Sequence, residues 1–225
     1  MIQYLKSLGM SLKEIQALQD EQDFSFFCRL LKTRDDCISA QIQNLQFQQK
    51  AIHRTIQNFE RYKNAPPDGS IFLEHLEKRL IYYSDSGINF YAHDKETCGQ
   101  ILHKFKNSFF TEQLPPVYFC NVGTILRKEN LLQHRFVSTE LFVFVDDTLG
   151  PNTPITEIPS GDYLCIYCNE FEKEITYAEK LLAAVEQQNN NILGDYLCEV
   201  LMEWPIVKEN TRKMLLRLQV PVQFQ

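Results

Sequence analysis

An apolar residue recurs at every seventh position between residues 23 and 64, a stretch that contains neither proline nor glycine. The stronger of two such series carries five apolar residues: Leu31, Ile38, Leu45, Ile52 and Phe59. The weaker series carries Ile42 and Ile56, and polar residues occupy its other positions, Asp35, Gln49 and Lys63. This spacing predicts one long helix with a coiled-coil seam, in which the polar seam positions can fix register or orientation.

The helix predicted over residues 23–64 would extend roughly 60 Å, which is too long for a compact domain. Many glutamines on its other faces are typical of a solvated rod. Burying the apolar stripe requires a partner, and a second copy of the same helix is the simplest one, so we expect a homodimer. The alternative is a long helix that folds back onto its own domain.

Shorter segments flank this helix on both sides. Residues 1–22 indicate a helical hairpin, because Gly9 is a natural helix terminator and Ser11 with Glu14 makes a capping box for a second helix. Residues 65–70 contain two prolines followed by a Gly-Ser pair, which stop the long helix and predict a linker.

The remaining segment, residues 71–225, shows the same order of elements twice. The first half predicts a strand, a helix capped by Asp94 and two further strands, at residues 79–83, 95–106, 117–126 and 141–145. The second half predicts the same series at residues 163–167, 174–188, 196–202 and 214–220. A duplicated β-α-β-β order predicts an α+β domain with one curved antiparallel sheet, covered by helices on one face. A concavity where the halves meet is the expected binding site.

Composition narrows the classes of function. Aromatic residues make up 12% of the chain, with 16 Phe and 10 Tyr, and tyrosine-rich strands can line a pocket for flat or cationic organic molecules. The net charge of −6 argues against a broad nucleic-acid surface in the C-terminal part. No apolar run is long enough to span a membrane and no signal peptide is visible, so we expect a cytoplasmic protein.

The cysteines do not predict a metal site or a disulfide framework. Seven are spread along the chain, mostly in apolar context, which is typical of reduced core cysteines in the cytosol. Cys165 and Cys168 form a C-x-x-C, but they lie in a strand pattern that points positions three apart to opposite faces. We therefore expect neither a metal nor another cofactor.

Two sets of residues resemble a known family. Residues 2–15, IQYLKSLGMSLKEI, resemble a stretch of MerR-type transcription regulators that ends their DNA-binding domain and precedes a long dimerisation helix. The duplicated half pattern resembles the gyrase-inhibitor-like effector-binding domain of the multidrug-sensing members, through the runs at residues 161–164, 194–199 and 216–222. The resemblance implies a ligand-sensing regulator with a DNA-binding remnant at residues 1–22, a dimerisation helix at 23–64 and an effector-binding domain at 71–225.

Two departures from the family pattern change what we expect. The chain starts at the motif, and the helix-turn-helix that reads DNA in this family would lie upstream. We therefore expect either a fragment or a relative without direct DNA binding, and promoter DNA is a partner only if that element exists. The second departure is Arg217, which stands where the family often has a glutamate. A role in ligand binding or catalysis is thereby less expected at this position.

For the ligand site we predict an acid surrounded by tyrosine rings, because this combination binds lipophilic cations. Glu199 lies in an apolar strand pattern, and the resemblance implies a pocket role for it; Glu203 is the second candidate. The predicted lining residues are Tyr83, Tyr118, Tyr167 and Tyr196, with Tyr163 and Phe144 behind them. Trp204 can serve equally as a structural cap or as a ligand contact.

Catalytic patterns are scarce. None of the five histidines has a Cys or Ser partner at a recognisable nucleophile spacing, and no glycine-rich phosphate loop is present. We therefore expect a non-enzymatic sensor of an organic, including a cationic, small molecule. The alternatives are a stand-alone drug-binding protein without DNA binding and a small hydrolase of the gyrase-inhibitor-like fold.

Overall fold

The computed structural model of the chain describes residues 2–21, 23–93, 95–111, 114–146, 155–203 and 214–224. It consists of two compact units, Met1–Lys50 and Ala51–Gln225. Their boundary falls within the long helix α3, Phe24–Asn64, whose last turns belong to the second unit. No helix in the described part of the chain combines the length and apolarity needed to cross a membrane.

The first unit is helical. Helices α1, Ile2–Ser7, and α2, Leu12–Glu21, precede α3, and Gly9 between them adopts a positive φ of 79°. The predicted capping box is present, because the Glu14 carboxylate accepts from the Ser11 amide at 2.6 Å and the Glu14 amide donates to the Ser11 hydroxyl. A small apolar cluster joins the three helices: Leu5, Met10, Ile15, Leu18, Phe27, Leu30 and Leu31.

The second unit is built on an antiparallel sheet of nine strands in the described residues. In chain order they are β1 Ile71–Leu76, β2 Arg79–Asp85, β3 Val122–Leu126, β4 Glu140–Val145, β5 Ile155–Ile158, β6 Gly161–Cys168, β7 Asn191–Ile192, β8 Tyr196–Glu203 and β9 Met214–Gln223. Their spatial order is β1-β6-β9-β8-β3-β4-β2-β5, and β7 pairs with β9. The junction of the two halves is the pairing of β3 with β8, in which Gly123 lies opposite Glu199.

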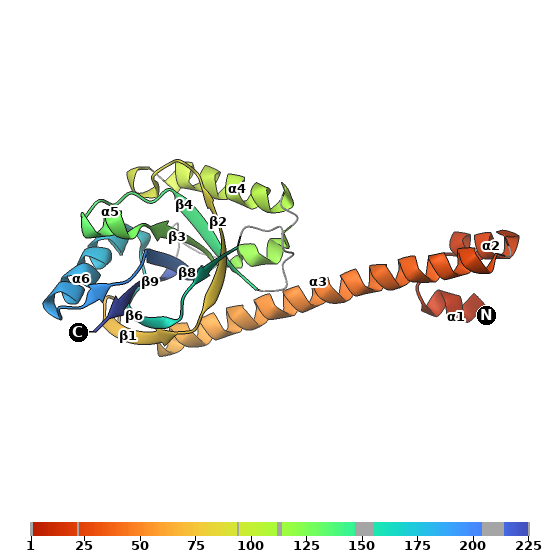
Figure 1. Cartoon of the computed structure of the whole chain (residues 1–225), viewed down its shortest axis with the longest axis horizontal. Coiled ribbons are helices and arrows are strands. Elements are labelled where there is room, and N and C mark those ends of the chain that lie inside the picture. The colour runs from red at the N-terminus through yellow and green to blue at the C-terminus, as the bar shows by residue number, and fades with distance from the viewer. Residues whose placement is uncertain are drawn as a thin grey trace, which may run out of the picture. The chain divides into compact units, whose positions relative to one another are not determined.

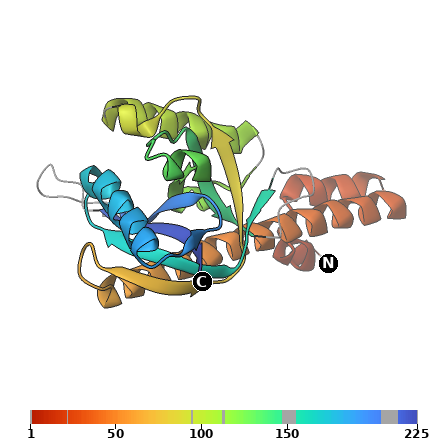
Figure 2. The ribbon, with the colours of Figure 1, turned by 60° about the vertical axis from the view of Figure 1, so that its left-hand side comes forward.

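Helices of the second unit lie against this sheet, as Figures 1 and 2 show. They are α4 Lys95–Thr111, α5 Lys128–Leu132 and α6 Glu174–Gln187, with the 3-10 turns η1 Phe90–Ala92, η2 Pro116–Cys120 and η3 Phe171–Lys173. The predicted α+β class, the long helix and the curved antiparallel sheet are confirmed. The strand predicted over residues 117–126 is wrong in its first half, because the chain there forms η2, which begins at Pro116. The sequence patterns also missed the strands β1, β5 and β7.

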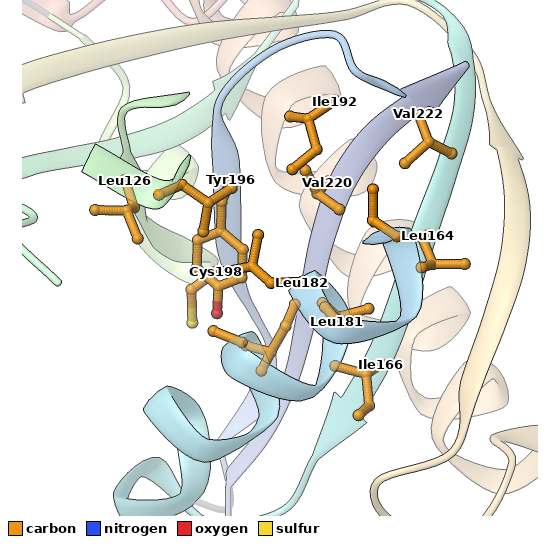
Figure 3. Packing of buried hydrophobic residues seen from close by; sticks show 14 of the residues in the cluster. Leu126, Leu164, Ile166, Leu181, Leu182, Ile192, Tyr196, Cys198, Val220 and Val222 are labelled. Atoms are coloured by element: carbon orange, nitrogen blue, oxygen red, sulfur yellow. The ribbon is translucent and has the colours of Figure 1, made fainter. Parts of the chain in front are cut away.

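A large core lies between α6 and the second half of the sheet. Leu181 and Leu182 of α6 pack toward Leu164 and Ile166 of β6 and toward Cys198 of β8 (Figure 3). The opposite face of the sheet is also largely buried, with Phe142, Tyr163 and Leu197 in a second cluster. Both faces of the central strands are therefore buried, and every side chain on them must be satisfied inside the protein.

Within the second unit, hydrogen bonds tie the last turns of α3 to the sheet and the linker to α6. The Asn58 amide donates to the Leu201 carbonyl of β8 at 2.9 Å, and Asn58 is buried. The linker contacts α6, because the Tyr177 hydroxyl donates to Asp68 at 2.8 Å and the Lys180 ammonium donates to the Gly69 carbonyl at 2.6 Å. These contacts fix the segment that follows α3 to the helix α6.

A glycine at the junction of the halves allows the close approach of β3, β4 and β8. A Cβ atom at Gly123 would lie 2.4 Å from the Phe142 ring and 2.5 Å from the Cys198 carbonyl oxygen. Gly99 of α4 is the matched case without contacts, because a Cβ there would meet no atom within 4 Å.

We predict that Gly123→Ala lowers the free energy of unfolding by about 2–3 kcal/mol, since the added methyl overpacks a buried strand junction. Gly99→Ala should raise it by up to about 1 kcal/mol, because alanine favours a helix interior. Urea denaturation of both variants measures the difference. Equal stabilities of the two variants would contradict the close packing at Gly123.

Candidate ligand-binding site

A chamber of about 550 Å³ lies between α4, the start of α6 and one face of the sheet. Its walls come from both halves of the domain. The first half supplies Phe90, Tyr91, His93, Cys98, Gly99, Leu102, Phe119, Val122, Gly123, Thr124 and Leu141. The second half supplies Phe171, Glu172, Ile175, Cys198, Val200, Met214 and Leu216. The volume is within the range of small-molecule sites.

The walls are mostly apolar and aromatic. The ionisable groups at neutral pH are the carboxylate of Glu172 and the imidazole of His93, and no lysine or arginine occurs among the described lining residues. A positively charged organic molecule therefore meets the Glu172 carboxylate and no lysine or arginine there, whereas an anion meets a group of its own charge. The chemistry of the walls favours lipophilic cations and neutral aromatic compounds over anions.

A buried acid lies directly behind this wall. Glu174 is the first residue of α6 and only 2% exposed. Its Oε1 accepts a hydrogen bond from the Tyr91 hydroxyl at 2.6 Å and from the Tyr196 hydroxyl at 3.3 Å. The Cys198 thiol also hydrogen-bonds this carboxyl. Since Tyr91 and Cys198 line the chamber, Glu174 is separated from its interior by a single layer of side chains.

Burial raises the pKa of Glu174, because the charged form loses its hydration. The hydrogen bonds from Tyr91, Cys198 and Tyr196 oppose this shift by stabilising the carboxylate. The position at the start of α6 adds to this stabilisation, since the N-terminal end of a helix carries a partial positive charge. Burial also raises the pKa of Tyr91 and of Tyr196 well above 10, so both phenols remain hydroxyl donors at neutral pH.

Glu199, the predicted ligand acid, lies on the other face of the sheet. It is 5% exposed and accepts two hydrogen bonds from the Arg217 guanidinium, at 2.7 Å and 3.1 Å. Gln219 donates a third at 3.2 Å, and Arg217 also donates to Glu74 at 3.0 Å. Burial would lower the pKa of Arg217, but Glu199 and Glu74 raise it above its ordinary range. The carboxylate of Glu199 is therefore neutralised by a cation of the protein itself.

A second arginine extends this charged cluster. The Arg79 guanidinium lies over the rings of Tyr163 and Phe144, at 5.1 Å and 5.4 Å from their centroids. Its Nη1 donates to Gln219 at 2.8 Å, while its buried Nε and Nη2 have no hydrogen-bond partner among the described residues. The two aromatic faces supply the favourable contacts of this cation.

The other predicted site residues are dispersed. Tyr83 and Tyr167 pack into clusters on the Glu199 face, and Tyr118 of η2 is buried and donates to Asp146 at 2.7 Å. Tyr196 reaches Glu174 as described above. The side chain of Glu203 and all of Trp204 lie outside the described residues. The described residues contain no cluster of His, Cys, Asp and Glu that could hold a metal ion.

The chamber and Glu199 are separated by the alternation of side chains along β8. Cys198 and Val200 point into the chamber, and Glu199 between them points away from it. Glu174 and Tyr91 were not predicted. An acid at the first position of a helix is ordinary, and Tyr91 lies outside every predicted element, so the sequence carried no signal that pairs them.

We predict that Arg217→Met lowers the free energy of unfolding by about 3–5 kcal/mol, because it leaves the Glu199 carboxylate buried without a cation. The double variant Arg217→Met/Glu199→Gln should be less destabilised than Arg217→Met alone. Lys78→Met is the control, since Lys78 pairs with Glu157 on the exposed surface and should cost no more than about 1 kcal/mol. Urea denaturation of Arg217→Met, Glu199→Gln and the double variant measures the coupling. If the effects of the two single variants simply add up in the double variant, Glu199 and Arg217 are not coupled.

No protein-family model matches the chain, and no curated protein matches it in sequence. Among solved structures it is similar to EcmrR in an EcmrR–DNA complex, at 15% identity and a TM-score of 0.45, over 100% of this chain and 81% of that chain. It is also similar to the EcmrR C-terminal domain, at 11% identity and a TM-score of 0.48, over 69% and 98% of the two chains. A third similar structure is SAV2435 bound to tetraphenylphosphonium, at 9% identity and a TM-score of 0.41, over 68% of this chain and 94% of that chain. These values are too low for a family or a function to be assigned from them.

Proposed function

We propose that this chain is a ligand-sensing regulator of the MerR type and that it binds an organic molecule in the chamber. The observation that carries the proposal is an apolar chamber of about 550 Å³ backed by the buried carboxyl of Glu174. Aromatic walls supply contact area and ring faces, and the carboxyl behind Tyr91 supplies negative charge. This combination suits a lipophilic cation.

The proposal is of a binding protein and not of an enzyme. The thiols that line the chamber belong to Cys98 and Cys198. Burial raises the pKa of Cys198 well above its ordinary range, so its thiol carries little of the thiolate that a nucleophile requires. The sequestering of drugs without DNA binding is the second candidate, because the chamber alone can perform it.

We further propose that the chain acts as a homodimer through α3. Its heptad positions form an apolar stripe that is largely exposed in the single chain: Ile42 is 51% exposed, Leu45 63%, Ile52 59%, Ile56 51% and Phe59 38%. The same heptad register on a second copy of the helix matches this stripe in length and polarity. In a complete regulator, such a helix pair would connect two sensing domains to two DNA-binding heads.

Tetraphenylphosphonium is a suitable probe of the chamber, since four phenyl groups and one delocalised charge match its walls, and SAV2435 is bound to this ion. We predict saturable binding by the wild-type chain and a rise of several degrees in its melting temperature. Leu102→Trp should lower the affinity at least tenfold, because the indole fills the chamber from α4. Leu132→Trp is the control, since Leu132 is 53% exposed on α5 and should leave binding unchanged. Equal binding by both variants in calorimetry would place the ligand elsewhere.

For the dimer, we predict that light scattering at micromolar concentration reports twice the mass of the chain. Leu45→Lys and Ile52→Lys together should produce monomers, because charges on the seam face each other across the helix pair. Gln48→Lys changes an exposed position outside the seam and should remain dimeric. A wild-type monomer under these conditions would refute the proposed coiled-coil dimer through α3.

A further inference from the structure

We propose that the chamber exchanges a proton for its ligand: a lipophilic monocation enters, and the Glu174 carboxyl releases a proton to solvent. The inference rests on the proposed ligand-binding function and adds a specific regulation to it. Charge balances in the exchange, because a neutral carboxyl plus a cation becomes a carboxylate plus the same cation and one free proton. Affinity for cations then depends on pH, while affinity for neutral ligands of similar shape does not.

The geometry provides the coupling between ligand and acid. Tyr91 lines the chamber, and its hydroxyl donates to Glu174 at 2.6 Å. Cys198 likewise lines the chamber and hydrogen-bonds the carboxyl. A cation over the Tyr91 ring is therefore one side chain away from the carboxyl, in surroundings where water screens little. A phenol that donates to a carboxylate also has a more electron-rich ring, which strengthens its attraction for the cation.

The empty chamber and the occupied chamber favour different forms of the acid. With 2% exposure and no cationic side chain among the groups that bond to it, Glu174 gains from being neutral when the chamber is empty. A bound cation supplies the missing opposite charge. The carboxylate that then forms has its hydrogen-bond donors already in place, from Tyr91 and Tyr196.

Glu199 cannot take this role without breaking an existing ion pair. Its carboxylate holds the Arg217 guanidinium at 2.7 Å, on the face of the sheet that points away from the chamber. A cation arriving there would have to displace an internal one. Glu174 has no such partner in the hydrogen bonds described, and this difference assigns the proton exchange to Glu174.

The other ionisable groups that face Glu174 do not titrate near neutrality. They are Tyr91 from η1, Tyr196 and Cys198 from β8, and Cys168 from β6. Burial raises the pKa of Tyr91, Tyr196 and Cys198 well above their ordinary values, and that of Cys168 to about 11. In the wall itself lie the exposed side chain of Glu172 and the imidazole of His93, and histidine is the residue type most often responsible for pH-dependent binding. His93 is therefore the group from which Glu174 must be distinguished.

The test is calorimetry of the full chain at a series of pH values, each in two buffers of different ionisation enthalpy, which counts the protons released on binding. Tetraphenylphosphonium is the cationic probe and triphenylphosphine oxide the neutral one. We expect up to one proton released for the cation and close to none for the neutral compound. Affinity for the cation should rise with pH by up to about tenfold per unit where a proton is released, and should level off at higher pH where Glu174 is already a carboxylate before binding.

Three variants identify the side chain that releases the proton. Glu174→Gln should bind the cation more weakly, release no proton and show a flat pH profile, while it keeps its affinity for the neutral probe. His93→Gln should retain the proton release. Tyr91→Phe removes one donor from the carboxylate, so the pH profile should move to higher pH with the proton release preserved; this variant serves if Glu174→Gln fails to fold.

Each result bears on a definite claim. Cation binding with no proton release in the wild type overturns the exchange and leaves the proposed ligand-binding function standing. Proton release that disappears in His93→Gln and persists in Glu174→Gln also overturns the exchange. If Glu174→Gln fails to fold, a pH profile in Tyr91→Phe that matches the wild-type profile overturns it. Failure of both probes to bind overturns the proposed function, and the exchange with it.

Discussion

The alternation of side chains in a sheet that is buried on both faces determines the rest of this structure. Along β8, Cys198 and Val200 enter the chamber between α4 and α6, while Glu199 enters the cluster with Arg217 on the opposite face. The carboxyl groups of Glu199 and Glu174 are both buried. Two acids only 25 positions apart in sequence therefore lie in separate environments, each with its own means of compensation.

The groups that stabilise the two buried acids differ in kind. Glu199 is matched by a full positive charge, with Gln219 as an additional donor and Glu74 as a second acceptor for Arg217. Glu174 is matched only by dipoles, from two phenols, a thiol and the start of a helix. A buried carboxyl without an internal counter-ion can be stabilised as a carboxylate by an incoming cation, whereas Glu199 already has such a counter-ion in Arg217. This contrast is why the chamber, and not the ion-pair cluster, is the candidate site.

The sequence predicted the regular parts of the fold because their signals are local. The seven-residue period gave α3, the capping box at Ser11 gave the start of α2, and apolar strand patterns gave β2, β4, β6, β8 and β9. The candidate site depends on contacts that no local pattern contains. Tyr91 and Glu174 are 83 positions apart, and which face Glu199 occupies depends on the register of β8 against β3 and β9. The sequence could indicate a buried acid in β8, but not that Arg217 neutralises it.

The hydrogen bonds between the linker and α6 have a mechanical consequence. The helix that carries Glu174 at its first residue also holds Asp68 through Tyr177 and the Gly69 carbonyl through Lys180. The Gly69 amide in turn donates to the Tyr167 carbonyl of β6 at 3.0 Å. A rotation or shift of α6 therefore cannot occur without stretching the attachment of the segment that leads out of α3. The wall of the chamber at the start of α6 and the end of α3 are therefore connected through the hydrogen bonds of the linker.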